Sequence, residues 1–450
     1  MIGANDMGDE RRNGHLLRVL GLGFGLAMGV GAVIGAGILR TPGSVLASVP
    51  LPWLALGLWV FAGVHALLTA NIVAETMAAL PRSGGLFNVA ERAFGPFGAV
   101  LVGWTDWVFN IAASAALAIA CGEYLALIFP ALAPHVALAG IGIAALLFAL
   151  NWIGVREGSA AQIVTSAAKL ALLIGLVAAI FLLRPAAGAS AVAAAAAPLG
   201  LLGIVTAYQL IVGTYAGWAS PAYFAEEAKD PARNMVRAIF GSLAAVIFIY
   251  LLMNAALLYA LPVERLSRSE LPVAEAISDI FGGTSVAIVA AVAIVCVLGT
   301  INAGIMLATR IMHGLGRDGF VPAIASRVNR GGTPDVAMAV SAAATLGLAA
   351  TGQFEAVFLA VGALSIAILV VVDAAFFALR WREPDLARPF RAWGYPWLPA
   401  LALALDFAVL AAFLIADRRA ALYMAAGIAL CIPLAFIARR GRARSAGTAA

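Results

Sequence analysis

The chain has 450 residues, of which 63% are hydrophobic and only 11% are charged. A soluble globular protein of this size needs more polar surface than that, so the composition indicates a membrane protein with several spans. The net charge of +5 does not point to nucleic acid, because the basic residues lie in short loops between apolar segments. The three cysteines are far apart and predict neither a disulfide framework nor a metal site: Cys121, Cys296 and Cys431.

Apolar segments long enough to cross a lipid bilayer follow a polar tail, residues 1–15, that has no signal-peptide cleavage pattern. A window of about 19 residues predicts an all-α membrane protein with about twelve transmembrane helices. The expected spans lie near residues 17–47, 52–79, 96–129, 136–153, 159–183, 199–225, 237–261, 284–312, 335–351, 355–379, 395–416 and 421–438.

Most lysine and arginine residues fall in the loops on one side of these spans, which the positive-inside rule assigns to the cytoplasm. We therefore expect a multi-pass protein of the inner membrane, with residues 1–15 and the basic tail 439–450 both cytoplasmic. The outer side receives few basic residues, namely Arg40, Arg184, Arg265, Arg268, Arg418 and Arg419.

Two apolar spans contain glycine-rich segments, residues 29–39 in the first span and residues 213–221 in the sixth. Glycine weakens a helix by about 1 kcal/mol, and a broken backbone within a bilayer needs protein or a water-filled cavity around it. Paired breaks are typical of secondary transporters with a binding site at the membrane midplane. We therefore expect helices 1 and 6 to be discontinuous. The alternative is that these glycines only permit close helix packing.

The spans 1–5 and 6–10 begin on opposite sides of the membrane, which permits a 5+5 inverted repeat. We expect the first five-helix repeat at residues 16–183 and the second at residues 199–380. Helices 11 and 12, at residues 394–438, then fall outside the repeat.

Short motifs follow one another along nearly the whole chain. They are GAVIGAGI at 31–38, PRSGG at 81–85, AFGP at 93–96, YAGW at 215–218, EEAKDPAR at 226–233, GRDG at 316–319, RPFR at 388–391 and GYP at 394–396. Their order and spacing resemble amino acid permeases of the amino acid-polyamine-organocation (APC) superfamily, in its L-type amino acid transporter-like or related bacterial branches. The resemblance implies transport of a small-molecule amino acid by alternating access, as proton-coupled symport or as sodium-independent exchange.

The two breaks supply groups that match the ends of an amino acid. Free N–H groups around residues 35–37 begin a half-helix, whose partial positive charge favours a carboxylate. The carbonyl groups around residues 213–215 end the other half-helix and can accept hydrogen bonds from an ammonium group. The candidate substrate-binding residues are Val33, Ile34, Gly35, Ala36, Gly37, Gly213, Thr214, Tyr215, Gly217 and Trp218.

The chain differs from the family pattern at both breaks. Ala32 and Ala36 stand where many relatives have threonine and serine, so backbone amides would bind the carboxylate almost alone. Gly213 stands where L-type relatives have a gating aromatic residue. Either the site is more open, or another aromatic side chain closes it.

Lys169 is the one basic residue expected within the membrane, about ten residues into span 5, where an unpaired ammonium group costs several kcal/mol. The resemblance places it beside span 1, where sodium-coupled relatives hold a cation. Burial favours the neutral amine, so Lys169 could release and rebind a proton during transport. The alternatives are a fixed charge in an obligate exchanger and a side chain that reaches the cytoplasmic surface.

Other polar residues within the spans are expected to face the protein interior and to bond between helices. They are His65, Asp106, Asn110, Tyr208, Asn254, Asn302 and Asp373. A charged cluster at the inner end of span 6 is either an inner gate, with Arg82 or Arg310, or a solvated helix end. The cluster comprises Glu226, Glu227, Asp230 and Arg233.

The sequence shows no catalytic motif, no phosphate-binding loop and no metal-ligand spacing, so we expect neither an enzyme nor a cofactor. A membrane enzyme or receptor of the same topology is the alternative from another class. The expected outer loop Pro130–His135 has no cysteine, so no disulfide-linked partner is expected.

Overall fold

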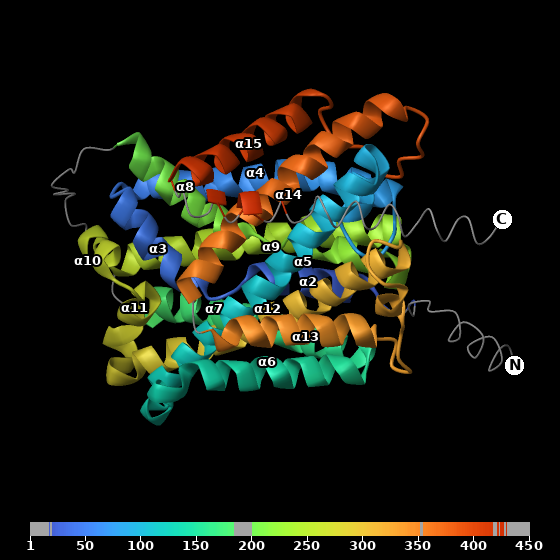
Figure 1. Ribbon diagram of the computed structural model, residues 1–450. Helices are drawn as coiled ribbons and strands as arrows, with labels where there is room; N and C mark the ends of the chain where they lie inside the picture. The colour runs from blue at the N-terminus through green and yellow to red at the C-terminus, as the bar shows by residue number, and fades with distance from the viewer. Residues whose placement is uncertain are drawn as a thin grey trace, which may run out of the picture.

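The computed structural model describes residues 18, 20–183, 200–351 and 354–416, together with parts of 421–429. The regular elements in these residues are helices, with two isolated β-bridges. The long helices run side by side across the molecule (Figure 1). They are α2 (Leu22–Val33), α3 (Gly37–Ser48), α4 (Pro52–Ala79), α5 (Phe87–Ile128), α6 (Val136–Ile153), α7 (Val155–Leu183), α8 (Leu201–Tyr215), α9 (Pro231–Ala260), α12 (Ser285–Arg317), α13 (Asp335–Ala350), α14 (Phe354–Arg382) and α15 (Trp397–Ala416).

Nine helical stretches in the described residues are long and apolar enough to cross a membrane. Helices α2 and α3 form a further candidate span that is bent by 43°, and the shorter apolar helix α13 occupies the expected ninth span. The expected twelfth span, 421–438, is not fully covered by the described residues. The all-α membrane fold is confirmed, whereas the count of twelve, the inverted repeat and the domain limits stay predictions.

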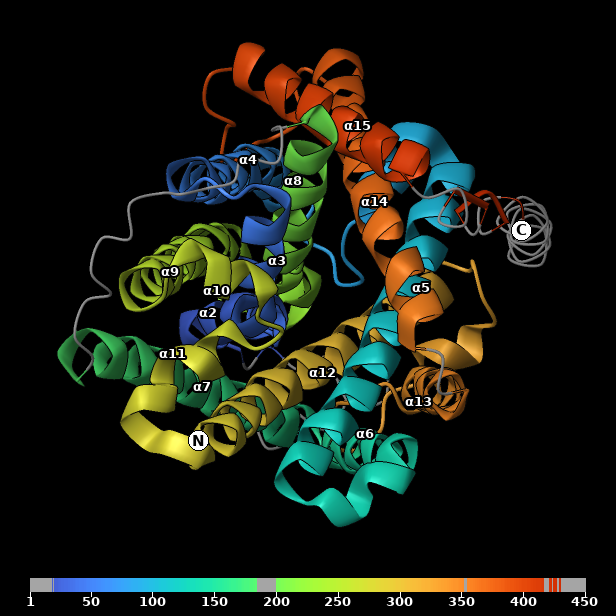
Figure 2. The same cartoon turned by 90° about the vertical axis from the view of Figure 1, so that its left-hand side faces the viewer.

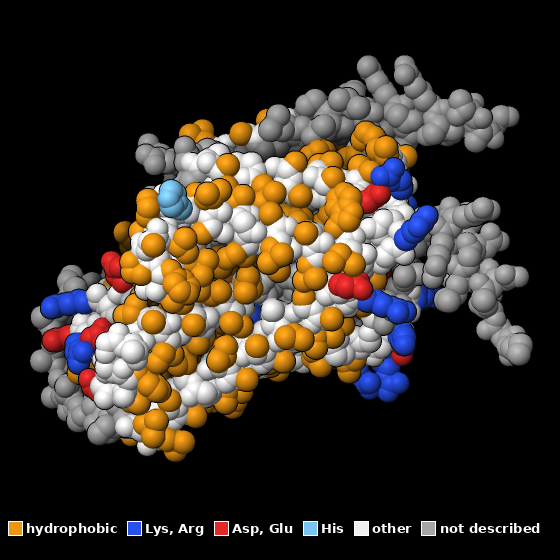
Figure 3. All heavy atoms as spheres, turned by 90° about the horizontal axis from the view of Figure 1, so that it is seen from below, with side chains coloured by type: hydrophobic (Ala, Val, Ile, Leu, Met, Phe, Trp, Pro, Cys, Tyr) orange, Lys and Arg blue, Asp and Glu red, His pale blue; other side chains and the backbone are white. Residues whose placement is uncertain are grey.

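The outer surface explains why these helices need a bilayer. Apolar side chains cover the middle of the face in Figure 3, and charged side chains gather toward its two ends. Leu146 on α6 and Phe248 on α9 are 69% and 63% exposed. Such surface costs about 25 cal/mol per Å² in water, and hydrocarbon chains remove that cost.

The helices form two groups that face each other in Figure 2. We call α2, α3, α4, α8 and α9 the bundle, because α9 packs against both α2 and α4, and α8 packs against α3 and α4. We call α5, α6, α12 and α13 the scaffold, in which α5 packs against the other three helices. Helix α7 contacts both groups, and α14 and α15 pack together between α4 and α5.

Short helices join these long ones at positions that the sequence did not indicate. They are η1 (Pro130–His135), η2 (Ser220–Glu227), α10 (Val263–Arg268), α11 (Pro272–Phe281), η3 (Gly282–Thr284) and η4 (Ala323–Ser326). Helix α10 packs closely on α3 at Gly43. A Cβ atom on Gly43 would lie 2.7 Å from the carbonyl oxygen of Ser269 and 2.8 Å from that of Leu266.

This contact predicts that Gly43→Ala lowers the free energy of unfolding by about 1–3 kcal/mol, because two backbone carbonyl groups would have to move. The matched control is Gly57→Ala on α4, where a Cβ atom would meet no atom within 4 Å. Thermal unfolding in detergent measures both variants. Equal melting temperatures for the two variants would contradict the close α3–α10 contact.

Candidate functional site

The first break separates α2, which ends at Val33, from α3, which begins at Gly37. The N–H group of Gly35 donates to the carbonyl oxygen of Val33 at 2.9 Å, so it is not free, contrary to the sequence-based expectation. The N–H groups that open α3 have no side-chain cap. The amides left for an anion are therefore those around Ala36 and Gly37.

The second break follows Tyr215, the last residue of α8. Ala216 turns to an extended conformation, and Gly217 has a φ of 105°, which a side chain rarely adopts. A Cβ atom on Gly217 would also lie 2.9 Å from the carbonyl oxygen of Ala32. Glycine is required here for both reasons, and its small size brings the two breaks into contact.

Tyr250 of α9 ties the two breaks together. Its hydroxyl oxygen lies 3.0 Å from the carbonyl oxygen of Thr214 and 3.3 Å from that of Val33, and the side chain is fully buried. A Cβ atom on Gly37 would lie 3.1 Å from Cγ2 of Thr214, so the first break packs directly on α8. Sequence analysis missed Tyr250, because a tyrosine in an apolar helix carries no local signal of its partners.

A cavity lies beside the second break. Of the candidate binding residues, Tyr215, Gly217 and Trp218 line it, and residues 33–37 of the first break are not in its lining. Gly213 is exposed and outside the lining, and a Cβ atom there would meet nothing within 4 Å. Buried aromatic side chains of Tyr215 and Trp218 occupy the cavity wall instead.

Asp106 and Asn110 of α5 face this cavity from the scaffold, and they share one helix face as the sequence predicts. The amide nitrogen of Asn110 donates to Oδ1 of Asp106 at 3.0 Å. The hydroxyl of Tyr223 donates to Oδ2 at 2.6 Å. Both carboxyl oxygens therefore have hydrogen-bond donors, and no basic side chain of the described residues is paired with Asp106.

Lys169 is completely buried, which rules out a side chain that reaches the surface. Its Nζ atom donates to the carbonyl oxygens of Gly31 at 3.0 Å, Ile34 at 2.7 Å and Cys296 at 2.9 Å. An ammonium group has three N–H donors, so three carbonyl groups satisfy it completely. A neutral amine would leave one carbonyl oxygen against a lone pair. This geometry favours the charged form in the present conformation.

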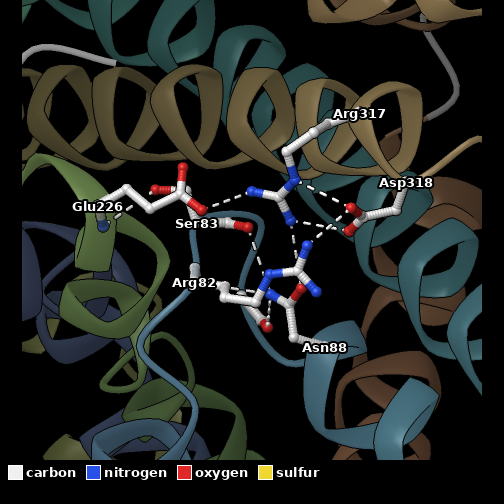
Figure 4. Close-up of polar contacts among 7 residues, drawn as sticks. Arg82, Ser83, Asn88, Glu226, Arg317 and Asp318 are labelled. Atoms are coloured by element: carbon white, nitrogen blue, oxygen red, sulfur yellow. Dashed lines mark hydrogen bonds and ion pairs between the residues drawn. The ribbon is translucent and has the colours of Figure 1, made fainter. Parts of the chain in front are cut away.

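An ion-pair network closes one end of the molecule. Glu227 of η2 accepts two hydrogen bonds from Arg310 of α12, at 3.0 and 3.1 Å, and both side chains are at most 1% exposed. Arg317 pairs with Glu226 and with Asp318 (Figure 4). The network therefore binds the second break to the scaffold.

The turn between α4 and α5 joins the same network. Arg82 pairs with Asp318 at 2.9 Å, and not with Glu226 or Glu227 (Figure 4). The hydroxyl of Ser83 accepts a hydrogen bond from the N–H of Glu226. Asp230 and Arg233, which the sequence grouped with this cluster, are exposed at the start of α9. Arg317 and Asp318 were missed as members, although the GRDG motif contains both.

Among the other polar residues, Asn302 joins three helices as predicted. Its side chain accepts from Asn151 of α6 at 2.7 Å and donates to Gln162 of α7 at 2.8 Å. Asn254 donates to the carbonyl oxygen of Tyr250 within its own helix. No group of three His, Cys, Asp or Glu side chains is placed to hold a metal ion in the described part of the chain.

A helical membrane protein with two facing backbone breaks beside a buried cavity has the architecture of discontinuous-helix transporters. The sequence model of the amino acid permease family matches residues 25–434, and the chain belongs to this family. Its homologues are membrane transporters.

Three relatives illustrate this similarity. The chain is 27% identical to the serine/threonine exchanger SteT of Bacillus subtilis over 93% of this chain and 95% of the relative. It is 27% identical to the human (Homo sapiens) cystine/glutamate transporter, over 84% of this chain and 77% of the relative. An uncharacterized transporter of Mycobacterium tuberculosis is 31% identical over 86% and 84% of the two chains.

The ion-pair network makes a testable prediction. Glu227→Gln leaves the buried Arg310 without a negative partner, which we expect to lower the free energy of unfolding by about 3–5 kcal/mol. The control is Glu275→Gln, whose partner Arg265 is 51% exposed, with an expected loss of about 0–1 kcal/mol. Unfolding midpoints in detergent compare the two, and equal losses would show that the buried pair does not stabilise this end.

Proposed function

We propose that this protein is a secondary transporter that moves amino acids across the inner membrane by alternating access, with both termini in the cytoplasm. The single observation that carries the proposal is the contact between the two backbone breaks beside the cavity. Membership of the amino acid permease family supports an amino acid as the substrate. The proposed activity is transport and not enzymatic catalysis, with no cofactor and no disulfide-linked partner.

The breaks supply complementary charges for the substrate backbone. The open amides at Ala36 and Gly37 bind the α-carboxylate, because they begin helix α3. The carbonyl oxygens of residues 213–215 bind the α-ammonium group, because each carbonyl group has two lone pairs and is not saturated by the contacts described. The side chain of the substrate then lies toward Trp218 and Asp106 in the cavity.

Alternating access requires the bundle to move against the scaffold. In the present conformation the ion-pair network joins η2 to α12, so the end that carries Arg310 and Arg317 is closed. Transport through this end requires the Arg310–Glu227 pair to separate. We propose that this network is the inner gate.

Lys169 acts in this proposal as a fixed cation that holds the carbonyl ends of α2. A charged lysine beside the first break replaces a bound sodium ion, which makes transport independent of sodium. Proton-coupled symport is our preferred mode, with the proton bound at a site other than Lys169. Exchange is the second candidate, and the name of the Bacillus subtilis relative favours it.

Purified protein in proteoliposomes tests the proposal. We expect uptake of at least one labelled amino acid from a panel of twenty, independent of sodium. An inside-alkaline pH gradient should drive accumulation if transport is symport. If transport is exchange, uptake should instead need unlabelled amino acid inside the vesicles. No uptake of any amino acid under either condition would contradict the proposed function.

Gly37→Val tests the carboxylate site. The branched side chain would cover the free amides and press on Thr214, so substrate affinity should fall by about tenfold or more, equivalent to about 1.4 kcal/mol. The double variant Gly37→Val/Thr214→Ser removes the Cγ2 contact and isolates the effect on the amides. Binding to the detergent-solubilised protein measures both. Recovery of full affinity in the double variant would show that packing, and not anion binding, requires this glycine.

Lys169→Met tests the fixed charge. Three buried carbonyl groups would lose their donors, so transport should be lost at every pH from about 5 to 8. A lysine that cycles a proton would give a different result. Lys169→Met would then keep pH-independent exchange and lose only gradient-driven uptake.

A further inference from the structure

A second cluster of buried polar side chains lies at the cavity wall, apart from the two breaks and from Lys169. We call it the acidic cluster, and it contains residues from four helices. They are His65 and Thr69 of α4, Tyr208 of α8, Asp373 of α14 and Asp406 of α15. His65, Thr69 and Asp406 line the cavity, so a substrate or water molecule in the cavity can reach the cluster.

Close polar contacts hold Asp406 and His65 beside each other. Oδ1 of Asp406 lies 3.2 Å from Nε2 of His65, and Oδ2 accepts from the hydroxyl of Thr69 at 3.0 Å. The other ring nitrogen of His65 lies 2.7 Å from the hydroxyl oxygen of Tyr208. Asp406 thus has a hydrogen-bond donor on Oδ2 and the His65 ring at ion-pair distance from Oδ1.

Asp373 has no such partners. It is 0% exposed, and neither of its oxygens has a hydrogen-bond donor among the described residues. The titratable group that faces it is the carboxyl group of Asp406. Two adjacent buried carboxyl groups cannot both be ionised without a large penalty, so they are expected to share a proton. That proton also supplies the donor that Asp373 lacks.

The charged groups near the two carboxyl groups are compatible with a bound proton. Among the described residues, His65 is the nitrogen base in contact with the pair, and Tyr208 of α8 is bonded to the other nitrogen of its ring. Arg380 of α14 lies two turns away and pairs with Glu75. Asp106 of α5 faces the same cavity, with both oxygens occupied by other partners.

We propose that Asp373 and Asp406, assisted by His65, bind the proton that is transported with the substrate. This proposal rests on the proposed transport function and locates its coupling ion. The cluster joins α4 and α8 of the bundle to α14 and α15, so gain or loss of a proton changes the attraction between parts that must move. The proton enters when the cavity opens to the outside and leaves when the cavity opens to the cytoplasm.

The test uses the full-length protein in proteoliposomes. At one proton per substrate, an inside-alkaline gradient of about one pH unit drives up to about tenfold accumulation in the parent protein. Asp373→Asn keeps the shape of the side chain and supplies a fixed N–H donor to Asp406. We expect this variant to lose accumulation and to retain exchange of labelled for unlabelled substrate. The control is Asp385→Asn, an exposed aspartate after α14, which should behave as the parent.

A second measurement does not depend on transport. In weak buffer at an alkaline pH, where the pair has lost its shared proton, the solubilised parent should take up about one proton for each substrate molecule that it binds, reported by a pH dye. Asp373→Asn and Asp406→Asn should each abolish this signal while substrate still binds. Because either variant alone is sufficient, the site is still tested if one of them fails to fold.

The outcomes separate the two proposals. Asp373→Asn with the accumulation and proton uptake of the parent would overturn the proton site. A parent that exchanges substrate but ignores the pH gradient would also overturn the site and leave a transporter of the exchange type. A parent that binds and transports no amino acid would overturn the transport function itself, and the proton site with it.

Discussion

The structure depends on one constraint, which is that broken backbone inside a membrane must find hydrogen-bond partners within the protein. Both breaks expose carbonyl and N–H groups, and side chains from other helices bond several of the carbonyl groups. Lys169 of α7 bonds two carbonyl groups at the end of α2, and Tyr250 of α9 lies between carbonyl groups of both breaks. The amides that open α3 are left over, which makes them suitable for a substrate.

The same constraint separates fixed charges from exchangeable ones. Lys169 has three carbonyl acceptors and Arg310 is paired with the carboxylate of Glu227, and each of these buried cations holds one break against another helix. Asp373 is a buried carboxyl group without a donor, beside a second carboxyl group. A group whose partners are complete gains nothing from losing its charge, whereas an incomplete pair can accept or release a proton. Coupling by the acidic cluster and anchoring by Lys169 are therefore compatible.

The ion-pair network and the cavity lie on either side of η2. Glu226 and Glu227 fix this short helix to α12, while Trp218 directly before it and Tyr223 within it line the cavity. A movement of η2 that opens the cavity to the basic end must therefore break the Arg310–Glu227 pair. Because both charges of this pair are buried, separation is costly unless substrate or water replaces the lost contacts.

The sequence by itself determined the membrane class, the positions of both breaks and the place of Lys169 within an apolar span, because composition, glycine content and the length of apolar segments are local properties. It also grouped Asp106 with Asn110, which are one helical turn apart. It did not determine that Arg317 and Asp318 join the ion-pair network, or that residues 65, 208, 373 and 406 meet. Those contacts join helices that are far apart in the chain, so only tertiary packing decided them.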